Sequence, residues 1–344
     1  MVTNAFNGGT EQDNFMPDEP TDYDYKEMLR NEGLNLFNSA RSRAFWREMI
    51  NLLRGKSAEL LSFEDIRTRL RLRQESYKGL QEVPLDKIVG SVGRYRDFTR
   101  DFLPKNNEMK DRWSRVYAEA TGFQGLPPIE LYKIGDAYFV RDGNHRVSVA
   151  RQLGAKTIEA HVTELPTRVE FTPGMSQEEI DLAAAYAAFL EETGLDETRP
   201  HHVSIRLSEP SRYNDLLGHV YLHQRIMELQ KGREVSLKEA AANWYDSVYR
   251  PAITLIRKYN IMENIDDRTE GDLYLWLVDH LREVREKYGE EAKTRKFSDA
   301  LVDFLHQHGL PIPRDLFTEH DDTVSIADTQ AMEVLKDDGD DDED

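Results

Sequence analysis

Apolar residues recur at helical spacing over the first patterned part of the chain. Between residues 25 and 55 they fall every three or four positions, which predicts a long amphipathic helix that ends near Gly55. A second helical pattern follows over residues 62–79, where Ser62 and Asp65 have the spacing of a capping box. The chain is therefore expected to form a helical extension over residues 25–79.

The pattern changes after residue 80 to short apolar runs separated by turn residues. "EVPLDKIVGS" reads as a short strand, and residues 96–122 read as a loop followed by a helix. Ile129–Ile134 and Ala137–Val140 predict a hairpin closed by Gly135 and Asp136. "HRVSVARQLGAK" predicts a helix with Gly154 at its end, and "TIEAHVTEL" predicts another strand.

Helical spacing returns from about residue 175 and dominates the rest of the chain. Ser176 is expected to cap the first of these helices, whose acidic first turn suits the helix dipole. "HHVSIRLS" predicts one strand, and four helical stretches follow over residues 213–231, 237–259, 270–288 and 294–308. Pro251 is expected to kink or divide the second of these stretches.

These patterns predict an α+β protein in several parts. They are an acidic disordered arm over residues 1–24, the helical extension over 25–79, a small mixed-sheet domain over 80–170, a helical domain over 175–310 and an acidic disordered tail over 311–344.

Composition narrows the class of protein. The 344 residues contain no cysteine, which excludes disulfides, thiol redox catalysis and thiolate-bound metal. No apolar run approaches the roughly 20 residues that span a bilayer, and residues 1–20 lack the basic start and apolar core of a secretory signal. We therefore expect a cytoplasmic protein without a membrane partner.

Charge is distributed unevenly along the chain. The formal net charge is -19, a balance that repels nucleic acid as a whole. Between Arg41 and Arg73, however, basic residues outnumber acidic ones. This segment is expected either to contact a phosphate-rich or protein partner or, as the favoured alternative, to balance an acidic neighbour within the molecule.

The densest polar chemistry lies where the second hairpin strand meets the following helix, in "VRDGNHRVSV". Gly143 permits a tight turn, and Asn144 or Asp142 is expected to cap the helix. His145 and Arg146 fall in the first turn, where a basic residue opposes the helix dipole unless an anion is bound. A phosphate site and a merely capped helix both remain open on spacing alone.

The segment from "VPLDKI" through "PPIELYKIGDAYFVRDGNHRVSVARQLGAKTIEAHV", about residues 80–165, resembles the N-terminal domain of ParB-type proteins in the ParB/sulfiredoxin superfamily. The resemblance implies a nucleotide ligand, CTP or ATP, with or without Mg²⁺. It also implies that the phosphates contact Asp142, Gly143, Asn144, His145 and Arg146. Arg94 in "GRYRDF" is the best candidate for a second phosphate contact, with a salt bridge to Asp97 or Asp101 as its alternative.

Departures from the superfamily pattern restrict the activity. Sulfiredoxins carry a cysteine where this chain has Asn144, so sulfinic acid repair is excluded. No helix-turn-helix reader is evident after the resembling segment. Superfamily kinases need a carboxylate base, for which Asp86 and Asp97 are candidates without diagnostic spacing.

Three functions follow in order of preference. The first is a bacterial ParB-like nucleotide-binding regulator, associated with DNA in transcription or chromosome partition, for which a dimer is a plausible oligomeric state. The second is an enzyme acting on phosphates: a small-molecule kinase, a nucleotide hydrolase or a nuclease-like protein. The third is an interaction scaffold in which the turn is only capped.

The C-terminal helices resemble an uncharacterised domain often found behind bacterial ParB-like domains, over about residues 200–290. His219 and His223 have a spacing that chelates metals, but the surrounding apolar residues favour a packed pair. No metal site is expected there.

Overall fold

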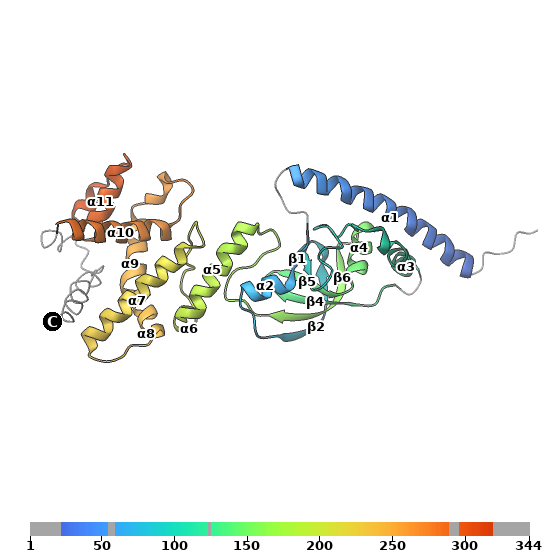
Figure 1. Ribbon diagram of the computed structural model, residues 1–344, viewed down its shortest axis with the longest axis horizontal. Helices are drawn as coiled ribbons and strands as arrows, with labels where there is room; N and C mark the ends of the chain where they lie inside the picture. Colours follow the sequence, from blue (N-terminus) through green and yellow to red (C-terminus); the bar gives the residue numbers. More distant parts are fainter. Residues whose placement is uncertain (1–21, 54–58, 123–124, 289–295, 319–344) are drawn as a thin grey trace, which may run out of the picture. The chain divides into compact units, whose positions relative to one another are not determined.

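The computed structural model describes residues 22–53, 59–122, 125–288 and 296–318 (Figure 1). The chain forms two compact units. The first comprises the residues up to Phe63, Tyr77–Tyr132 and Tyr138–Val162, and the second comprises Glu64–Ser76, Lys133–Ala137 and the residues from Thr163 onward. Both acidic arms predicted from the sequence lie mostly outside the described residues.

A six-stranded mixed sheet forms the centre of the β structure, with the strand order β1-β3-β5-β4-β6-β2. The strands are β1 (Leu61–Ser62), β2 (Ser76–Pro84), β3 (Ile88–Ser91), β4 (Ile129–Ile134), β5 (Ala137–Asp142) and β6 (Thr157–Leu165). β3 pairs in parallel with both β1 and β5. The predicted β4–β5 hairpin is present, and Gly135 in its turn has φ 55°.

Three helices belong to the first unit: α1 (Asp22–Leu53), α3 (Lys110–Thr121) and α4 (Asn144–Gln152). α1 packs along α3, and α3 packs against α4 (Figure 1). Phe37 of α1, Trp113 of α3 and Val147 of α4 are fully buried in one core with strand residues such as Leu131 and Val162. The first unit is thus a layer of helices packed on a sheet.

The helix expected over residues 62–79 is shorter than predicted. α2 (Phe63–Arg69) ends after two turns, and β2 already begins at Ser76. Arg71 adopts the left-handed region, with φ 57°, which an L-residue rarely continues as a helix. The strand predicted over "EVPLDKIVGS" is likewise divided, because a 3-10 turn over Leu85–Lys87 separates β2 from β3.

The second unit is mostly helical, as the spacing predicted. Its helices are α5 (Gln177–Thr193), α6 (Leu195–Thr198), α7 (Arg212–Lys231), α8 (Leu237–Trp244), α9 (Arg250–Lys258), α10 (Glu270–Tyr288) and α11 (Phe297–Gln307). Short 3-10 turns follow α9 and α11, over Ile261–Asn264 and Arg314–Thr318. The chain as a whole is a mixed α and β protein, in agreement with the predicted α+β class.

The strand predicted in "HHVSIRLS" is absent from the described fold. Its backbone instead bonds to tyrosine hydroxyls: the amides of Val203 and Ile205 donate to Tyr245 and Tyr186, at 3.0 and 3.2 Å. The hydroxyl of Tyr213 donates to the Ile205 carbonyl at 2.8 Å. Since helices supply these partners, the segment needs no neighbouring strand.

Pro251 follows a change of hydrogen-bonding pattern in the helical stretch that contains it. A π-helical turn over Tyr245–Tyr249 joins α8 to α9, and Pro251 occupies the first turn of α9. The helical backbone continues through this point, since Tyr249 and Arg250 have helical angles and the Arg250 amide donates to the Tyr245 carbonyl. The stretch is therefore not divided at Pro251, and its hydrogen-bonding pattern changes in the π turn ahead of the proline.

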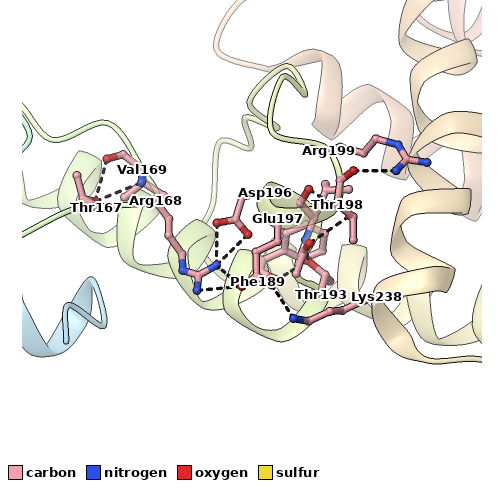
Figure 2. A network of polar contacts seen from close by, with 12 residues as sticks. Thr167, Arg168, Val169, Phe189, Thr193, Asp196, Glu197, Thr198, Arg199 and Lys238 are labelled. Carbon is pink, nitrogen blue, oxygen red and sulfur yellow. Dashed lines mark hydrogen bonds and ion pairs between the residues drawn. The ribbon is translucent and has the colours of Figure 1, made fainter. Parts of the chain in front are cut away.

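Charged side chains of the second unit are paired in a network around α6 (Figure 2). Arg168 donates to both oxygens of Asp196, at 2.9 and 2.7 Å, and lies 3.4 Å from Glu197. Lys238 donates to the other oxygen of Glu197 at 2.6 Å. Each cation in this network has a carboxylate partner, as expected of a structural cluster.

Candidate functional site

The polar cluster singled out in the sequence lies at the junction of β5 and α4. Asp142 is the last residue of β5, and Gly143 is the N-cap of α4, with φ 112°. A Cβ atom at residue 143 would meet Ile129 Cγ2 at 2.5 Å, closer than side chains tolerate. Both the backbone conformation and the space therefore require glycine at this turn.

The start of α4 has no side-chain cap, so the expected capping by Asn144 or Asp142 is wrong. The carboxylate of Asp142 instead accepts a hydrogen bond from Arg146 at 2.5 Å. The first amide to bond back along the helix is that of Val147, to the Gly143 carbonyl. The amides of the first turn thus lack helical partners, and no acidic residue stands among them.

Arg146 is held in place by the protein itself. Its Nη1 donates to the carbonyls of Pro127 and Pro128, at 2.9 and 2.8 Å, and its Nη2 donates to Asp142. These bonds tie the segment ahead of β4 to the first turn of α4. In this arrangement Arg146 shapes the turn, and its terminal nitrogens are engaged within the protein.

Asn144 and His145 are buried with polar atoms that lack partners. The two residues are 8% and 5% exposed, and the ring of His145 meets the ring of Phe98 edge-on at 5.5 Å. Within the described part of the chain, Asn144 Oδ1 and both ring nitrogens of His145 have no hydrogen-bond partner. Each unsatisfied buried polar group costs about 1–3 kcal/mol, a cost that a bound ligand would remove.

Positive charge surrounds His145. Burial is the main cause, and together with the nearby guanidinium groups of Arg112 and Arg94 it lowers the pKa of His145 to about 4. The imidazole is therefore neutral at neutral pH, with one nitrogen free to donate and the other to accept. The site combines two cations, a helix start and a buried neutral histidine.

The two arginines differ in their partners. Arg94 forms the ion pair with Asp97 that the sequence left open, at 3.5 Å. Arg112, an exposed residue of α3, makes no ion pair among residues 22–53, 59–122, 125–288 and 296–318. Sequence reasoning missed Arg112, because only the packing of α3 on α4 brings it toward His145.

The segment between β3 and α3 is fixed to the core behind the site. Ser148 of α4 donates to the Phe102 carbonyl at 2.6 Å and accepts from the Trp113 indole at 2.9 Å. Arg151 donates to the carbonyls of Leu85 and Ile88, at 2.5 and 2.9 Å. These buried bonds join α3, α4 and the intervening segment into one support for the site.

The two candidate carboxylate bases, Asp97 and Asp86, both have an arginine nearby. Asp97 pairs with Arg94. Asp86 lies near Arg151, where its charge partly offsets the burial that lowers the pKa of Arg151 to about 10. Among the described residues, both candidate bases thus lie beside an arginine.

The basic segment over residues 41–73 is largely neutralised within the protein. Arg69 pairs with Asp181, and Arg71 and Arg73 both pair with Glu191. The hydrogen bond from Arg71 is the main reason that the pKa of Glu191 falls below its usual value. The balancing role, favoured from the sequence, accounts for these arginines, and a DNA or protein partner for the segment stays a prediction.

The histidines of α7 are packed side chains in the structure. His223 shares a hydrogen bond of 2.7 Å with the Asn243 side chain, and His219 lies edge-on to the ring of Tyr274. Among the described residues, no group of three or more His, Asp or Glu side chains has the arrangement of a metal site. No helix there has the length and apolarity that a membrane span requires.

Comparison with known proteins adds little to this geometry. No known family model matches the sequence, and no curated protein matches it. A solved structure of the pNOB8-like ParB N-domain is similar at a TM-score of 0.18 and 13% identity, covering 78% of this chain and 79% of that chain. So low a TM-score does not establish a shared fold and assigns nothing to this chain.

Proposed function

We propose that the first unit binds the phosphate groups of a nucleotide, CTP or ATP, at the start of α4. The observation that carries this proposal is the set of buried polar atoms without partners on Asn144 and His145, at an uncapped helix start beside Arg94 and Arg112. The sequence resemblance to ParB-type domains supports a nucleotide as the source of the phosphate.

The chemistry of the site fits a phosphate. Unpaired amides and the positive end of the helix dipole attract anions at a helix start. The guanidinium groups of Arg94 and Arg112 add charge-assisted donors. A neutral His145 has one N–H to donate to a phosphate oxygen. Asn144 Oδ1 accepts hydrogen bonds and would suit a hydroxyl or amino group of the nucleoside.

Binding, with a regulatory consequence, is favoured over catalysis. The two carboxylates near the turn are engaged, Asp97 by Arg94 and Asp142 by Arg146. A kinase or hydrolase needs a general base or a positioned water, and neither aspartate is free for that role here. We therefore propose a nucleotide-dependent regulator, and an association with DNA or a protein partner is part of that proposal.

Equilibrium binding of CTP and of ATP to the full chain, measured by calorimetry, tests the proposal. Arg112→Ala should weaken binding at least tenfold, because a charge-assisted hydrogen bond contributes about 1.5–3 kcal/mol. Arg115→Ala is the matched control: Arg115 is exposed on the same helix, and its Nε donates to the Asp111 carbonyl.

Absence of binding for both nucleotides, or equal weakening by the two variants, would overturn the proposal. If a nucleotide binds, its recovery unchanged after many times the binding half-life supports a regulator. Transfer of its terminal phosphate to a second substrate would instead show a kinase.

A further inference from the structure

A second concave site lies wholly within the helical unit. A cavity of about 720 Å³ opens beside the π-helical turn and the first turns of α9. Val203, Ser204, Arg206 and residues 268–271 also line it. Its size falls in the range of about 300–1,000 Å³ that is typical of small-molecule sites.

The lining of this cavity is strongly cationic. Four arginines line it, and Glu270 is its one acidic residue among those described: the arginines are Arg206, Arg250, Arg257 and Arg268. This contrasts with the chain as a whole, whose net charge is -19. Gathering like charges in one cavity is unfavourable unless an anion compensates them.

Ion pairs within the protein engage only some of these four arginines. Arg257 binds Glu270 with two parallel hydrogen bonds, at 2.7 and 2.6 Å, and so neutralises the one acid. Arg268 reaches Glu209 at 3.4 Å. Arg250 approaches Asp246 only to 3.9 Å, and Arg206 makes no ion pair within the described residues. Arg206 and Arg250 therefore keep most of their donors available.

Burial and hydrogen bonds hold the residues that line this cavity in place. Tyr245 and Tyr249 of the π turn are buried, and the Tyr245 hydroxyl accepts a hydrogen bond from the Val203 amide. The Thr269 hydroxyl donates to the Arg206 carbonyl at 2.6 Å, which fixes the backbone of Arg206 beside the cavity. π turns inside helices occur frequently at functional sites.

We propose that this cavity binds a small molecule with two or more phosphate groups, which Arg206 and Arg250 contact. Guanidinium groups suit such a ligand because their planar donors match phosphate oxygens in pairs. Arg257 and Arg268 stay with their carboxylates, so Arg206 and Arg250 supply the charge that the ligand meets. This site is independent of the one at α4.

Calorimetric titration with inorganic pyrophosphate tests the site, and the Arg112→Ala chain is used throughout so that the α4 site contributes little. Arg206→Gln with Arg250→Gln should weaken pyrophosphate binding at least tenfold. The matched control is Arg225→Gln with Arg282→Gln, which removes two exposed, ion-paired arginines that do not line the cavity. It should leave the affinity unchanged. Circular dichroism verifies that each chain is folded.

Two results would overturn this inference. One is the absence of pyrophosphate binding in the Arg112→Ala chain. The other is equal weakening by the two double variants, which would mean that pyrophosphate responds only to overall surface charge. Neither result bears on nucleotide binding at α4, which the Arg112→Ala and Arg115→Ala comparison addresses separately.

Discussion

The helices α4 and α5 begin in opposite ways. At α5, Ser176 Oγ accepts from the Glu179 amide at 3.2 Å, and the Glu179 carboxylate accepts from the Ser176 amide at 2.7 Å. This capping box satisfies the helix start from within the chain. At α4, Gly143 supplies no side chain, and the first turn holds His145 and Arg146 where α5 has acids.

An uncapped start alone does not mark a binding site. α3 and α7 also begin without a side-chain cap, but Asp111 and Asp215 stand in their first turns and compensate the positive end of the dipole. α4 has neither a side-chain cap nor an acid in its first turn. It also buries polar atoms without partners beside two arginines. The comparison teaches that the start of α4 lacks local compensation in several independent ways, which is the basis for proposing a ligand there.

The largest expected effect comes from filling the turn of α4. Gly143→Ala should lower the free energy of unfolding by about 3 kcal/mol, since it adds the strain of a positive φ to a clash with Ile129. Gly154→Ala at the other end of α4 is the control: its φ is also positive, at 76°, but a Cβ there meets nothing within 4 Å. It should cost about 1 kcal/mol. Urea unfolding measures both, and equal losses would contradict the close approach at residue 143.

Acid should weaken the fold through His145. Its pKa is about 4 in the folded protein and near 6.5 in the unfolded chain, so between these values the unfolded chain binds more protons. Stability is therefore complete above about pH 6.5 and falls as the pH drops toward 4. The contribution of His145 should be a loss of about 2 kcal/mol between pH 7 and pH 5.

His145→Gln isolates this contribution. The variant keeps a polar side chain but removes the titrating group, so its stability should fall less between pH 7 and pH 5 than that of the native chain. Urea unfolding at both pH values gives the difference, in which the other titrating groups cancel. Equal losses in the two chains would show that His145 titrates normally and is not desolvated.

The smallest effect is expected at α5. Ser176→Ala removes one half of the capping box and should cost about 1 kcal/mol of stability. Nucleotide affinity should stay unchanged, because the α5 start is already satisfied by the chain. Thermal unfolding and calorimetry measure the two quantities. A loss of nucleotide affinity in this variant would contradict the claim that nucleotide binds at the start of α4 and not at that of α5.

Local pattern was sufficient to predict several parts of this protein. The β4–β5 hairpin followed from a turn pair between apolar runs, and the α5 cap followed from Ser176 before an acidic first turn. Both features are fixed by neighbours in sequence, where propensity and spacing are informative.

Features that depend on distant contacts could not be predicted. "HHVSIRLS" has the alternation of a strand, but tyrosine hydroxyls from helices satisfy its backbone. Arg112 joins the site only through the packing of α3 on α4. Arg146 was expected to face the ligand, and only the fold reveals the carbonyls of Pro127 and Pro128 that hold it.

The most direct test of the central claim is the pKa of His145, followed by NMR of the ring between pH 5 and pH 8 with and without saturating CTP or ATP. The His145→Gln spectrum identifies the signal among the ten histidines. Without nucleotide the signal should scarcely titrate in this range. With nucleotide its pKa should rise by about one pH unit or more, because a phosphate beside the ring favours the imidazolium. An unchanged titration in the presence of either nucleotide would contradict a phosphate site at the start of α4.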